Sequence, residues 1–483
     1  MSDRENLATP ADPAASLAER RAKLAGLRAA GNPYPNDFSR KQTLRPVIAE
    51  HRDVPADELA QRQVAIVVAG RLMSKHSEGE TSYGMLEDAT GRIQIAVTDE
   101  ASGKANHAAF TEWDVGDILG VEGILFKTAA GELTIRAHAI RLLAKSLRAP
   151  ADSPRDAEAA PARPRYAQLM VDADARRLLA VRARALQAIR RLFSSTQYME
   201  VETPMLQPVP GSDVGRSFET HHNALDMMLY LRSSAIPYLA RLAVGGMEKI
   251  FEINRSFHND AAFAEQGIER TVMEIYCAYS GHDYMMGLLE LVIGRTAKVA
   301  IDATTLRAQG QDIDLARPCA RIRLEDAIRQ HAGIQASEAE LRDRAFLADV
   351  LRERGAHVDD AASWGALQLA LLRAAVAPQL VQPTFVVDLP RDQVALARRS
   401  QRSPELAEAF ELYIGGRPVA QGASMINDGA ELDTRVTDPQ LLRAIEYGLP
   451  PASSAALAID VLAMLLTGSD SLHAVIPFPA PQR

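Results

Sequence analysis

The segment VGGMEKIFEINRSF, residues 244–257, determines the fold class of the larger part of this chain. It follows a helical segment at Ala173–Thr196 and the extended run MEVETPML (199–206), and it precedes helical sequence over about Met285–Ala377. The strand-like runs TFVVDL and FELYIGG and a helix near Ala455–Leu466 complete the pattern. Because strands and helices do not alternate regularly, this order predicts an α+β domain, an antiparallel sheet with helices, and not a doubly wound parallel sheet.

A different pattern precedes this domain and predicts a small barrel. Five β-rich runs are separated by glycine-containing turns: VAIVVAG, SYGMLED, GRIQIAV, DILGVEGILF and ELTIRAHAIRLL. Such spacing fits a Greek-key barrel. The segment APADSPRDAEAAPARP is rich in proline, alanine and charge, which favours a linker. The predicted parts are therefore a basic lead-in (1–60), the barrel (61–148), the linker (149–165) and the larger domain (166–483).

The N-terminal segment Ser16–Ala30 is predicted to be an amphipathic helix with basic residues. These are Arg20, Arg21, Lys23 and Arg28, and Arg40, Lys41 and Arg45 extend the basic character. A net charge of -8 gives the chain no overall attraction for nucleic acid, so contact with RNA requires a local basic surface. The helix is either such a surface, meeting phosphates, or an ordinary solvated face.

Composition excludes several classes of protein. The 483 residues are 47% hydrophobic and 24% charged, which is typical of a globular protein of two or three domains. Two cysteines, Cys277 and Cys319, lack a second pair that would make a metal site and suit a reducing cytoplasm. No apolar run approaches the roughly 20 residues of a membrane span, and the polar N-terminus is unlike a secretion signal. We therefore expect a soluble cytoplasmic protein.

Longer sequence words carry the functional information, because the chain has no P-loop, no glycine-rich dinucleotide turn and no HExxH helix. In order, these words are YPNDFSR, WDVGDILGVEGILFKTAAGEL, YMEVETPML, THHNALD, YLRSS, VGGMEKIFEINRSF, LVQPTF, FELYIGGR and EYGLPP. In content, order and spacing they resemble the class II lysyl-tRNA synthetases of bacterial type. The resemblance covers essentially the whole chain.

This resemblance implies an anticodon-binding OB barrel and a catalytic domain on an antiparallel sheet of six or more strands. It also implies a homodimer with Pro204 at its interface, and tRNA, ATP and Mg²⁺ as partner, substrate and cofactor. In the family, ATP and lysine give lysyl-adenylate, which then esterifies the 3′ end of tRNA. Because the lysine carboxylate attacks an α-phosphate that is already anionic, arginines and Mg²⁺ must neutralise the charge.

The second motif of the family is changed in this sequence. The family has phenylalanine, arginine, any residue and glutamate, with the arginine on the α-phosphate, whereas this chain has Phe257, His258, Asn259 and Asp260. Histidine lacks the bidentate fork of arginine. His258 is interpreted as structural or, alternatively, as a general base. Arg270 replaces the phenylalanine that stacks on adenine, and its guanidinium plane can still stack.

The third motif has lost its glycines and its arginine. The corresponding run, Ser454–Val461, is SAALAIDV, in which side chains replace three glycines and Val461 replaces the arginine that reaches the γ-phosphate. The added Cβ atoms crowd the floor of the nucleotide site. A phosphate-directed arginine contributes about 10³ to 10⁵ in rate in phosphoryl transfer. Loss of two such arginines therefore predicts weak or absent adenylation.

The amino-acid pocket implied by the family is also changed. Ile236 occupies the position of a glutamate that faces the lysine α-amino group. Met425, four residues after Gln421, occupies the position of a glutamate that pairs with the ε-ammonium. A buried ammonium without a partner is strongly unfavourable. Free lysine is therefore a poor ligand for this pocket.

Three residues of the family's site remain. Glu274 and Tyr276 belong to the amino-acid pocket, and Glu411 is one of two magnesium-binding acids, the other being replaced by Pro418. With Arg270, Glu411 is a remnant of the nucleotide site, and any binding of ATP or Mg²⁺ is expected to be weak. The alternative is that Glu274, Tyr276 and Glu411 are structural hydrogen-bonding groups of the sheet.

The barrel departs less from the family. The anticodon-stacking aromatic corresponds to Tyr83, the base-contacting glutamine to Gln94, an acid on the next hairpin to Glu132, and a basic residue to Arg71. Aromatic faces stack on splayed bases, and amide and carboxylate groups contact base edges. These residues are therefore predicted to bind tRNA, with ordinary barrel-surface residues as the alternative.

The resulting hypothesis is a dimeric pseudo-synthetase that retains tRNA binding but adenylates lysine weakly or not at all. One alternative is an active ligase that charges tRNA with lysine, or that adenylates another acid in a rebuilt pocket. Another is a regulatory partner that forms mixed dimers with an intact synthetase.

Overall fold

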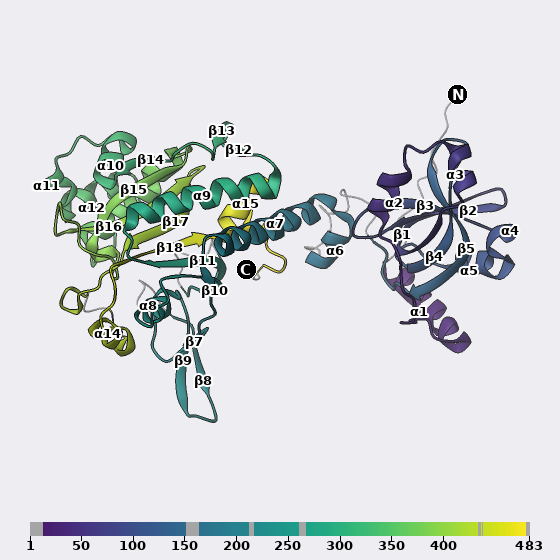
Figure 1. The fold of residues 1–483 in the computed structure, drawn as a ribbon, viewed down its shortest axis with the longest axis horizontal. Helices are drawn as coiled ribbons and strands as arrows, with labels where there is room; N and C mark the ends of the chain where they lie inside the picture. Colours follow the sequence, from purple (N-terminus) through teal and green to yellow (C-terminus); the bar gives the residue numbers. More distant parts are fainter. Residues whose placement is uncertain are drawn as a thin grey trace. The chain divides into compact units, whose positions relative to one another are not determined.

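In a computed structural model, the chain divides into two compact units, Met1–Asp172 and Ala173–Arg483. The structure describes residues 13–150, 164–211, 217–259, 267–432, 436 and 438–479. Figure 1 shows the helices and strands of both units. Among the described residues, no helix combines the length and apolar character needed to cross a membrane.

The first unit contains a closed barrel of five strands in the order β1-β2-β3-β5-β4, which confirms the predicted OB-type fold. Inward and outward positions alternate, so that Ile93, Ile95 and Val97 of β3 fill the interior. The elements are α1 (Pro13–Ala30), α2 (Leu44–His51), α3 (Ala56–Arg62), β1 (Ala65–Glu78), β2 (Thr81–Glu87), β3 (Arg92–Thr98), α4 (Asp99–Ser102), α5 (Lys104–Glu112), β4 (Ile118–Lys127), β5 (Leu133–Ala144) and α6 (Arg165–Val171).

The second unit is built on an eight-stranded sheet, as expected for an α+β domain. Neighbouring strands are antiparallel except at the two edges of the sheet. There β6 is parallel to β10, and β14 is parallel to β15. In spatial order the strands are β14 (Ala320–Arg323), β15 (Thr384–Pro390), β16 (Leu406–Ile414), β17 (Arg417–Ser424), β18 (Ala452–Ala458), β11 (Glu269–Ala278), β10 (Lys249–Phe257) and β6 (Met199–Glu200). A separate small sheet contains β7 (Leu206–Gln207), β9 (Met227–Leu231) and β8 (Glu219–His222).

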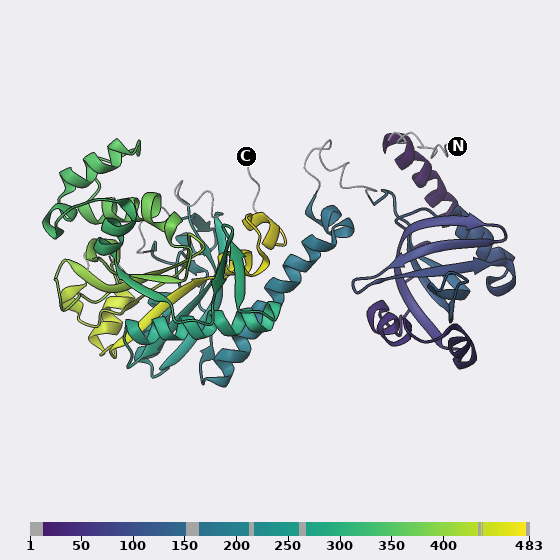
Figure 2. The same cartoon turned by 90° about the horizontal axis from the view of Figure 1, so that it is seen from above.

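Helices cover the large sheet unequally. The predicted long helix is α7 (Ala173–Ser195), whose buried residues Val181, Ala185 and Ile189 recur every four positions and pack with α9 and α15 against one face (Figure 1, Figure 2). Two other apolar clusters cover the ends of the opposite face. The remaining helices are α8 (Ile236–Val244), α9 (His282–Ile301), α10 (Leu324–Ala332), α11 (Glu338–Leu341), α12 (Arg344–Glu353), α13 (Trp364–Leu371), α14 (Pro439–Glu446), α15 (Ile459–Thr467) and α16 (Leu472–Val475).

The expectation of helical sequence over Met285–Ala377 is wrong for residues 305–323. A hairpin of β12 (Thr305–Ala308) and β13 (Gln311–Asp314) and then strand β14 occupy this stretch. Gln309 and Gly310 have φ values of 50° and 73°, which is the left-handed pair of a type I′ turn. The dipeptide Gln-Gly was therefore a local signal for a hairpin.

The helix expected near Ala455–Leu466 begins later than predicted. Residues Ala452–Ala458 form strand β18, and α15 starts at Ile459. β18 pairs with β17 on one side and β11 on the other, so hydrogen bonding on both edges overrides the helix propensity of its alanines. The small side chains of this strand fit the centre of the sheet.

Candidate functional site

A single row of residues crosses the less covered face of the large sheet. The strand register pairs Glu252 with Glu274, Glu274 with Ala456, Ala456 with Gln421, and Gln421 with Glu411. Directly paired residues project from the same face of a sheet. The structure therefore brings together three of the residues that the sequence singled out, Glu274, Gln421 and Glu411.

Glu274 is occupied by contacts within the protein. It is 2% exposed. Its Oε2 accepts the Asn254 amide at 2.6 Å and the Ala235 backbone N–H at 2.8 Å, and its Oε1 accepts the Ser234 hydroxyl. Ala235 is the residue before α8. The carboxylate thus fixes the start of α8 instead of presenting its acceptors to a ligand amine.

The residues of the predicted amino-acid pocket pack together as apolar core. Ile236, Tyr276 and Met425 are buried in one cluster with α8 and α14 residues. The cavity beside Ile236 and Met425 has a volume of about 10 Å³, which is about the space that one water molecule needs. Ser454 Oγ donates to the sulfur of Met425 at 2.9 Å. This cavity is too small for a lysine side chain.

Tyr276 presents a hydroxyl to this apolar cluster. Within the part of the chain that the structure describes, its buried Oη has no hydrogen-bond partner. Burial raises the pKa of Tyr276 above its ordinary value, so the phenol stays neutral. The group contributes no charge that could pair with a ligand ammonium.

The changed positions of the second and third motifs are also engaged within the protein. The Arg270 guanidinium, which is paired in register with Ser256, donates diagonally to Nε2 of His258 just after β10, and Asp260 lies outside the described residues. Val461 packs in the first turn of α15 against the apolar core under α7 and α9. Its neighbour Asp460 forms a buried ion pair with Arg182.

The acids near Glu411 do not form a magnesium site. Tyr413 Oη donates to Glu411 Oε2 at 2.5 Å, and Pro418 supplies no second carboxylate. Magnesium needs near-octahedral oxygen ligands, usually one or two carboxylates with waters and phosphates. In the described ranges no group of three or more His, Cys, Asp or Glu residues could hold a metal ion. The residues present therefore do not fit the family's Mg²⁺.

Two of the predicted tRNA-binding residues lie close together on the outer face of the barrel. Tyr83 stacks on His76, with ring centroids 5.3 Å apart and an interplanar angle of 20°. Gln94 pairs with Met85, two residues along β2 from Tyr83, and its Oε1 accepts the Thr134 hydroxyl at 2.8 Å. Both side chains project outward, because the residues adjacent to them in their strands, such as Gly84, Ile93 and Ile95, face the interior.

Glu132 and Arg71 differ from each other in availability. Glu132 is exposed just before β5. Arg71 is half-buried and donates to the Gly116 carbonyl at 2.6 Å. Desolvation lowers the pKa of Arg71, while the charges of Asp117 and Glu87 act in the opposite direction. Arg71 is thus part of the barrel framework, whereas Glu132 is open to a ligand.

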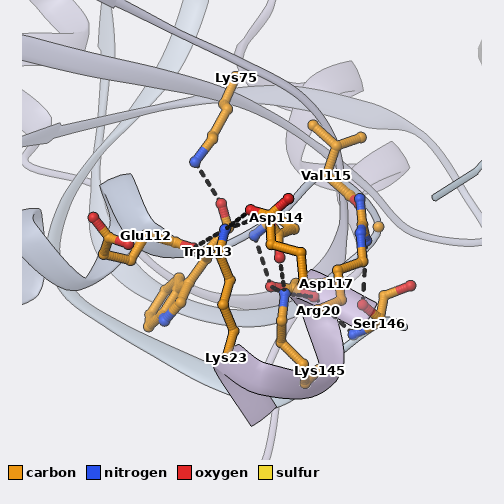
Figure 3. A network of polar contacts seen from close by, with 12 residues as sticks. Arg20, Lys23, Lys75, Glu112, Trp113, Asp114, Val115, Asp117, Lys145 and Ser146 are labelled. Atoms are coloured by element: carbon orange, nitrogen blue, oxygen red, sulfur yellow. Dashed lines mark hydrogen bonds and ion pairs between the residues drawn. The ribbon is translucent and has the colours of Figure 1, made fainter. Parts of the chain in front are cut away.

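The basic helix is attached to the barrel by two of the residues predicted to meet phosphates, Arg20 and Lys23, and the hypothesis is wrong for the buried Arg20 (Figure 3). Arg20 is 9% exposed and donates to the carbonyls of Val115 and Ser146 at 3.0 and 3.2 Å. Lys23 pairs with Asp114 at 2.9 Å. Arg21 is exposed. A buried arginine that already binds two carbonyls cannot contact a phosphate.

A buried group of charges underlies these contacts of the helix. Lys145, with 1% of its side chain exposed, pairs with Asp114 and with Asp117, whose side chain is 0% exposed (Figure 3). Asp117 also accepts the backbone N–H of Ser146 at 2.7 Å. The group joins the end of β5, the loop before β4 and helix α1. Sequence reasoning missed it because its members lie far apart in the chain.

Exposed apolar side chains surround Pro204, the predicted interface residue. Pro204 is itself exposed, Met205 is 48% exposed, Leu206 45% and Met199 54%. Figure 1 shows the β7-β9-β8 sheet that follows this segment extending away from the main sheet. An exposed apolar patch of this kind is typical of an interaction surface.

Comparison with known proteins identifies similar sequences over both units. Residues 157–482 match a family described as "tRNA synthetases class II (D, K and N)", and residues 66–143 match one described as "OB-fold nucleic acid binding domain". The chain is 40% identical to a lysine–tRNA ligase of Nitrosomonas europaea, with 96% of each chain covered. It is 40% identical to that of Thiobacillus denitrificans, with 97% of each covered, and 39% identical to that of Chromobacterium violaceum, with 99% of each covered.

Proposed function

The chain belongs to the class II lysyl-tRNA synthetase family, and from this premise we propose that it is a pseudo-synthetase that binds tRNA but does not adenylate lysine appreciably. The observation that carries the proposal is the apolar cluster of Ile236, Tyr276 and Met425 where the family binds lysine. An ammonium buried there without a carboxylate costs several kcal/mol or more. The site therefore disfavours lysine before any chemistry begins.

The chemical step lacks its charge neutralisation as well. Attack of the lysine carboxylate on the α-phosphorus breaks the bond to pyrophosphate and requires cations around the phosphates. His258 accepts a hydrogen bond from Arg270, and Val461 is packed in the core, so neither position supplies a cation. Replacement of two phosphate-directed arginines lowers the rate by about 10³-fold or more.

Binding of tRNA is supported by the outer face of the barrel. Tyr83 offers an aromatic ring, Gln94 an amide and Glu132 an exposed carboxylate. These are the groups that stack on splayed bases and contact their edges. The proposal assigns lysine-type anticodon recognition to this face.

The proposal includes a homodimer. Pro204, Met205 and Leu206 form an exposed apolar segment, next to a hollow of about 370 Å³ lined by Thr203, Arg232 and other residues. A second copy of the chain would cover this surface in a two-fold arrangement. Light scattering at micromolar concentration should give twice the mass of the chain, and a monomer would contradict this part of the proposal.

An active ligase is the second candidate, and the 40% identity to lysine–tRNA ligases over nearly the full length favours it. ATP–pyrophosphate exchange with each of the twenty amino acids separates the two. We expect exchange with lysine to be about 10³-fold or more below that of the Nitrosomonas europaea relative, assayed as a control. Exchange within tenfold of that relative would contradict the pseudo-synthetase. Exchange with a different acid would establish a rebuilt ligase.

The tRNA-binding part has its own test. The chain should bind an anticodon stem-loop with the lysine U-rich triplet more tightly than a loop with a scrambled triplet. Tyr83→Ala should weaken the matched complex by about 1–3 kcal/mol through lost base stacking, whereas Tyr83→Phe should keep it. Equal affinity for both loops, unchanged by Tyr83→Ala, would show that the barrel does not read tRNA.

A further inference from the structure

A row of side chains crosses all five strands on the outer face of the barrel. The register pairs His76 with Tyr83, Tyr83 with Ala96, Ala96 with Arg136, and Arg136 with Ile124. Directly paired residues project from the same face, so these five side chains form one line. Alternation of inward and outward positions in β5 was the sequence signal that would have added Arg136 to the candidate residues. His76 had no such signal, because a register shift between Leu72 and Ser74 reverses the alternation of β1 before it.

A second row lies next to the first and contains the predicted base-reading glutamine. It consists of Met85, Gln94, Thr134 and Phe126, each paired in register with the next. Gln94 therefore lies between the Tyr83 side and the Arg136 side of the face. The Gln94 amide can therefore contact the edge of a base stacked on Tyr83 or the edge of a base stacked on Arg136.

Arg136 is a charged plane supported by an aromatic ring. Its guanidinium carbon lies 4.8 Å from the centroid of the Phe126 ring, and the residue is exposed. Over the described ranges, no acid forms an ion pair with Arg136 and no acceptor takes a hydrogen bond from it. By contrast, Arg92 pairs with Glu87 at 2.5 Å and Arg141 pairs with Asp37 at 2.8 Å. The positive charge of Arg136 is thus available to a ligand.

His76 supports Tyr83 in a similar way. The two rings are nearly parallel, and His76 is exposed while Tyr83 is half-buried. A ring held flat against a neighbour loses little conformational freedom when a base stacks on it. The outer face therefore carries two planar pairs, His76–Tyr83 and Phe126–Arg136, on either side of Ala96.

We propose that the Phe126–Arg136 pair is a second base-stacking platform, which takes the base next to the one on the His76–Tyr83 pair. This inference rests on the proposed function of the barrel. Tyr83 and Arg136 are separated by two strand spacings, about 10 Å, which exceeds the 3.4 Å or so between stacked bases. The ligand is therefore single-stranded RNA with two unstacked bases, and the guanidinium also attracts its phosphates.

The test measures binding of the full-length chain to an anticodon stem-loop with the lysine-type triplet. Arg136→Lys keeps the charge but removes the plane, and Phe126→Leu removes the ring that holds the plane. Each should weaken binding by about 5- to 150-fold, the loss expected for one stacked base. The salt dependence of Arg136→Lys should stay that of the wild type, because the number of phosphate contacts is unchanged. Arg92→Lys, on the same barrel but paired with Glu87, is the matched control and should change affinity less than twofold.

A series of stem-loops that each lack one loop base identifies the base concerned. One loop base should stack on Tyr83, and its removal should abolish the effect of Tyr83→Ala. Removal of the neighbouring base should abolish the effect of Arg136→Lys, because the stacking partner of Arg136 is then already absent. Full additivity at every position would overturn the second platform. Affinities of Arg136→Lys and Phe126→Leu within twofold of the wild type would also overturn the second platform. If Tyr83→Ala still weakened binding in that case, the proposed function would remain intact. Failure of the wild type to bind any loop would overturn both.

Discussion

The barrel and the large sheet differ in where their charged and planar groups are placed. In the barrel, the buried Lys145 and Asp117 and the partly buried Asp114 form one group that attaches helix α1, while Tyr83 and Arg136 remain on the outer face. In the sheet, Glu274, Glu411 and Met425 make internal contacts. The barrel therefore separates its framework from its surface, whereas these side chains of the sheet belong to the framework.

The proposed function rests on this difference between the two units. A ligand reaches the outer face of the barrel without breaking an internal hydrogen bond of Tyr83 or Arg136. A ligand at the sheet must first displace the Asn254, Ala235 and Ser234 contacts of Glu274 and open the cluster around Met425. Each buried polar group left without its partner costs about 1–3 kcal/mol. Binding at the sheet is therefore penalised by the fold itself.

The strongest test of this comparison is to restore the family's acid in the closed pocket. Met425→Glu should lower the free energy of unfolding of the second unit by about 3–5 kcal/mol, because it buries a carboxylate without a partner. Gln440→Glu, at an exposed position in the first turn of α14, is the matched control and should change it by less than about 0.5 kcal/mol. Urea unfolding followed by the fluorescence of Trp364, in a Trp113→Phe background, gives both values.

Lysine sharpens the same experiment. In the wild type, calorimetry should detect no saturable binding of lysine at millimolar concentration. If millimolar lysine restores the stability of Met425→Glu, the pocket opens and pairs the ammonium after all, and the sheet has kept its surface character. Absence of rescue is the expected result.

The second test removes the framework of the barrel. Lys145→Met leaves Asp117 buried without its cation, and Asp114 with Lys23 alone, and should cost about 3 kcal/mol of barrel stability. Lys104→Met, an exposed lysine of the same unit, is the control and should cost less than about 0.5 kcal/mol. The fluorescence of Trp113, in a Trp364→Phe background, reports the barrel. Equal unfolding curves for the two variants would show that the buried charges do not hold the barrel together.

Acidification examines the same charges in the unmodified protein. Burial acts to raise the pKa of Asp114, but hydrogen bonds from Lys145 and Lys23 outweigh it and leave the pKa below its ordinary value. A lowered carboxyl pKa contributes stability above the unfolded pKa, about 3.9, and that stability is lost as the pH falls through the folded pKa. The wild-type barrel should therefore lose stability below about pH 4, and Lys145→Met should show a flatter profile.

Much of the architecture followed from local sequence, whereas the state of the site did not. The β-rich runs and helix α7 were predictable because alternation and helical spacing are local properties. The strand at Ala452–Ala458 was not, because alanine favours a helix unless pairing on both edges decides otherwise. The family resemblance located Glu274 and Met425, but only the fold shows that one is saturated by hydrogen bonds and the other packed in a cluster.

Helix α1 gives the smallest and most specific test, because two adjacent arginines have opposite environments. Arg20 lies three residues after Leu17 and four before Leu24, which places it on the apolar stripe, and it donates to two barrel carbonyls. Arg21 is exposed. Arg20→Ala should lower barrel stability by about 1–2 kcal/mol, because buried carbonyl oxygens lose a charged donor.

Arg21→Ala should leave stability within about 0.5 kcal/mol of the wild type. It should reduce the salt dependence of tRNA binding by about one unit of slope if the helix meets a phosphate, whereas Arg20→Ala should leave that slope unchanged. Unfolding curves and tRNA titrations at several salt concentrations separate the two roles. A change in slope on Arg20→Ala at unchanged stability would mean that the helix detaches to bind RNA, and that the framework and the surface of the barrel are not separate.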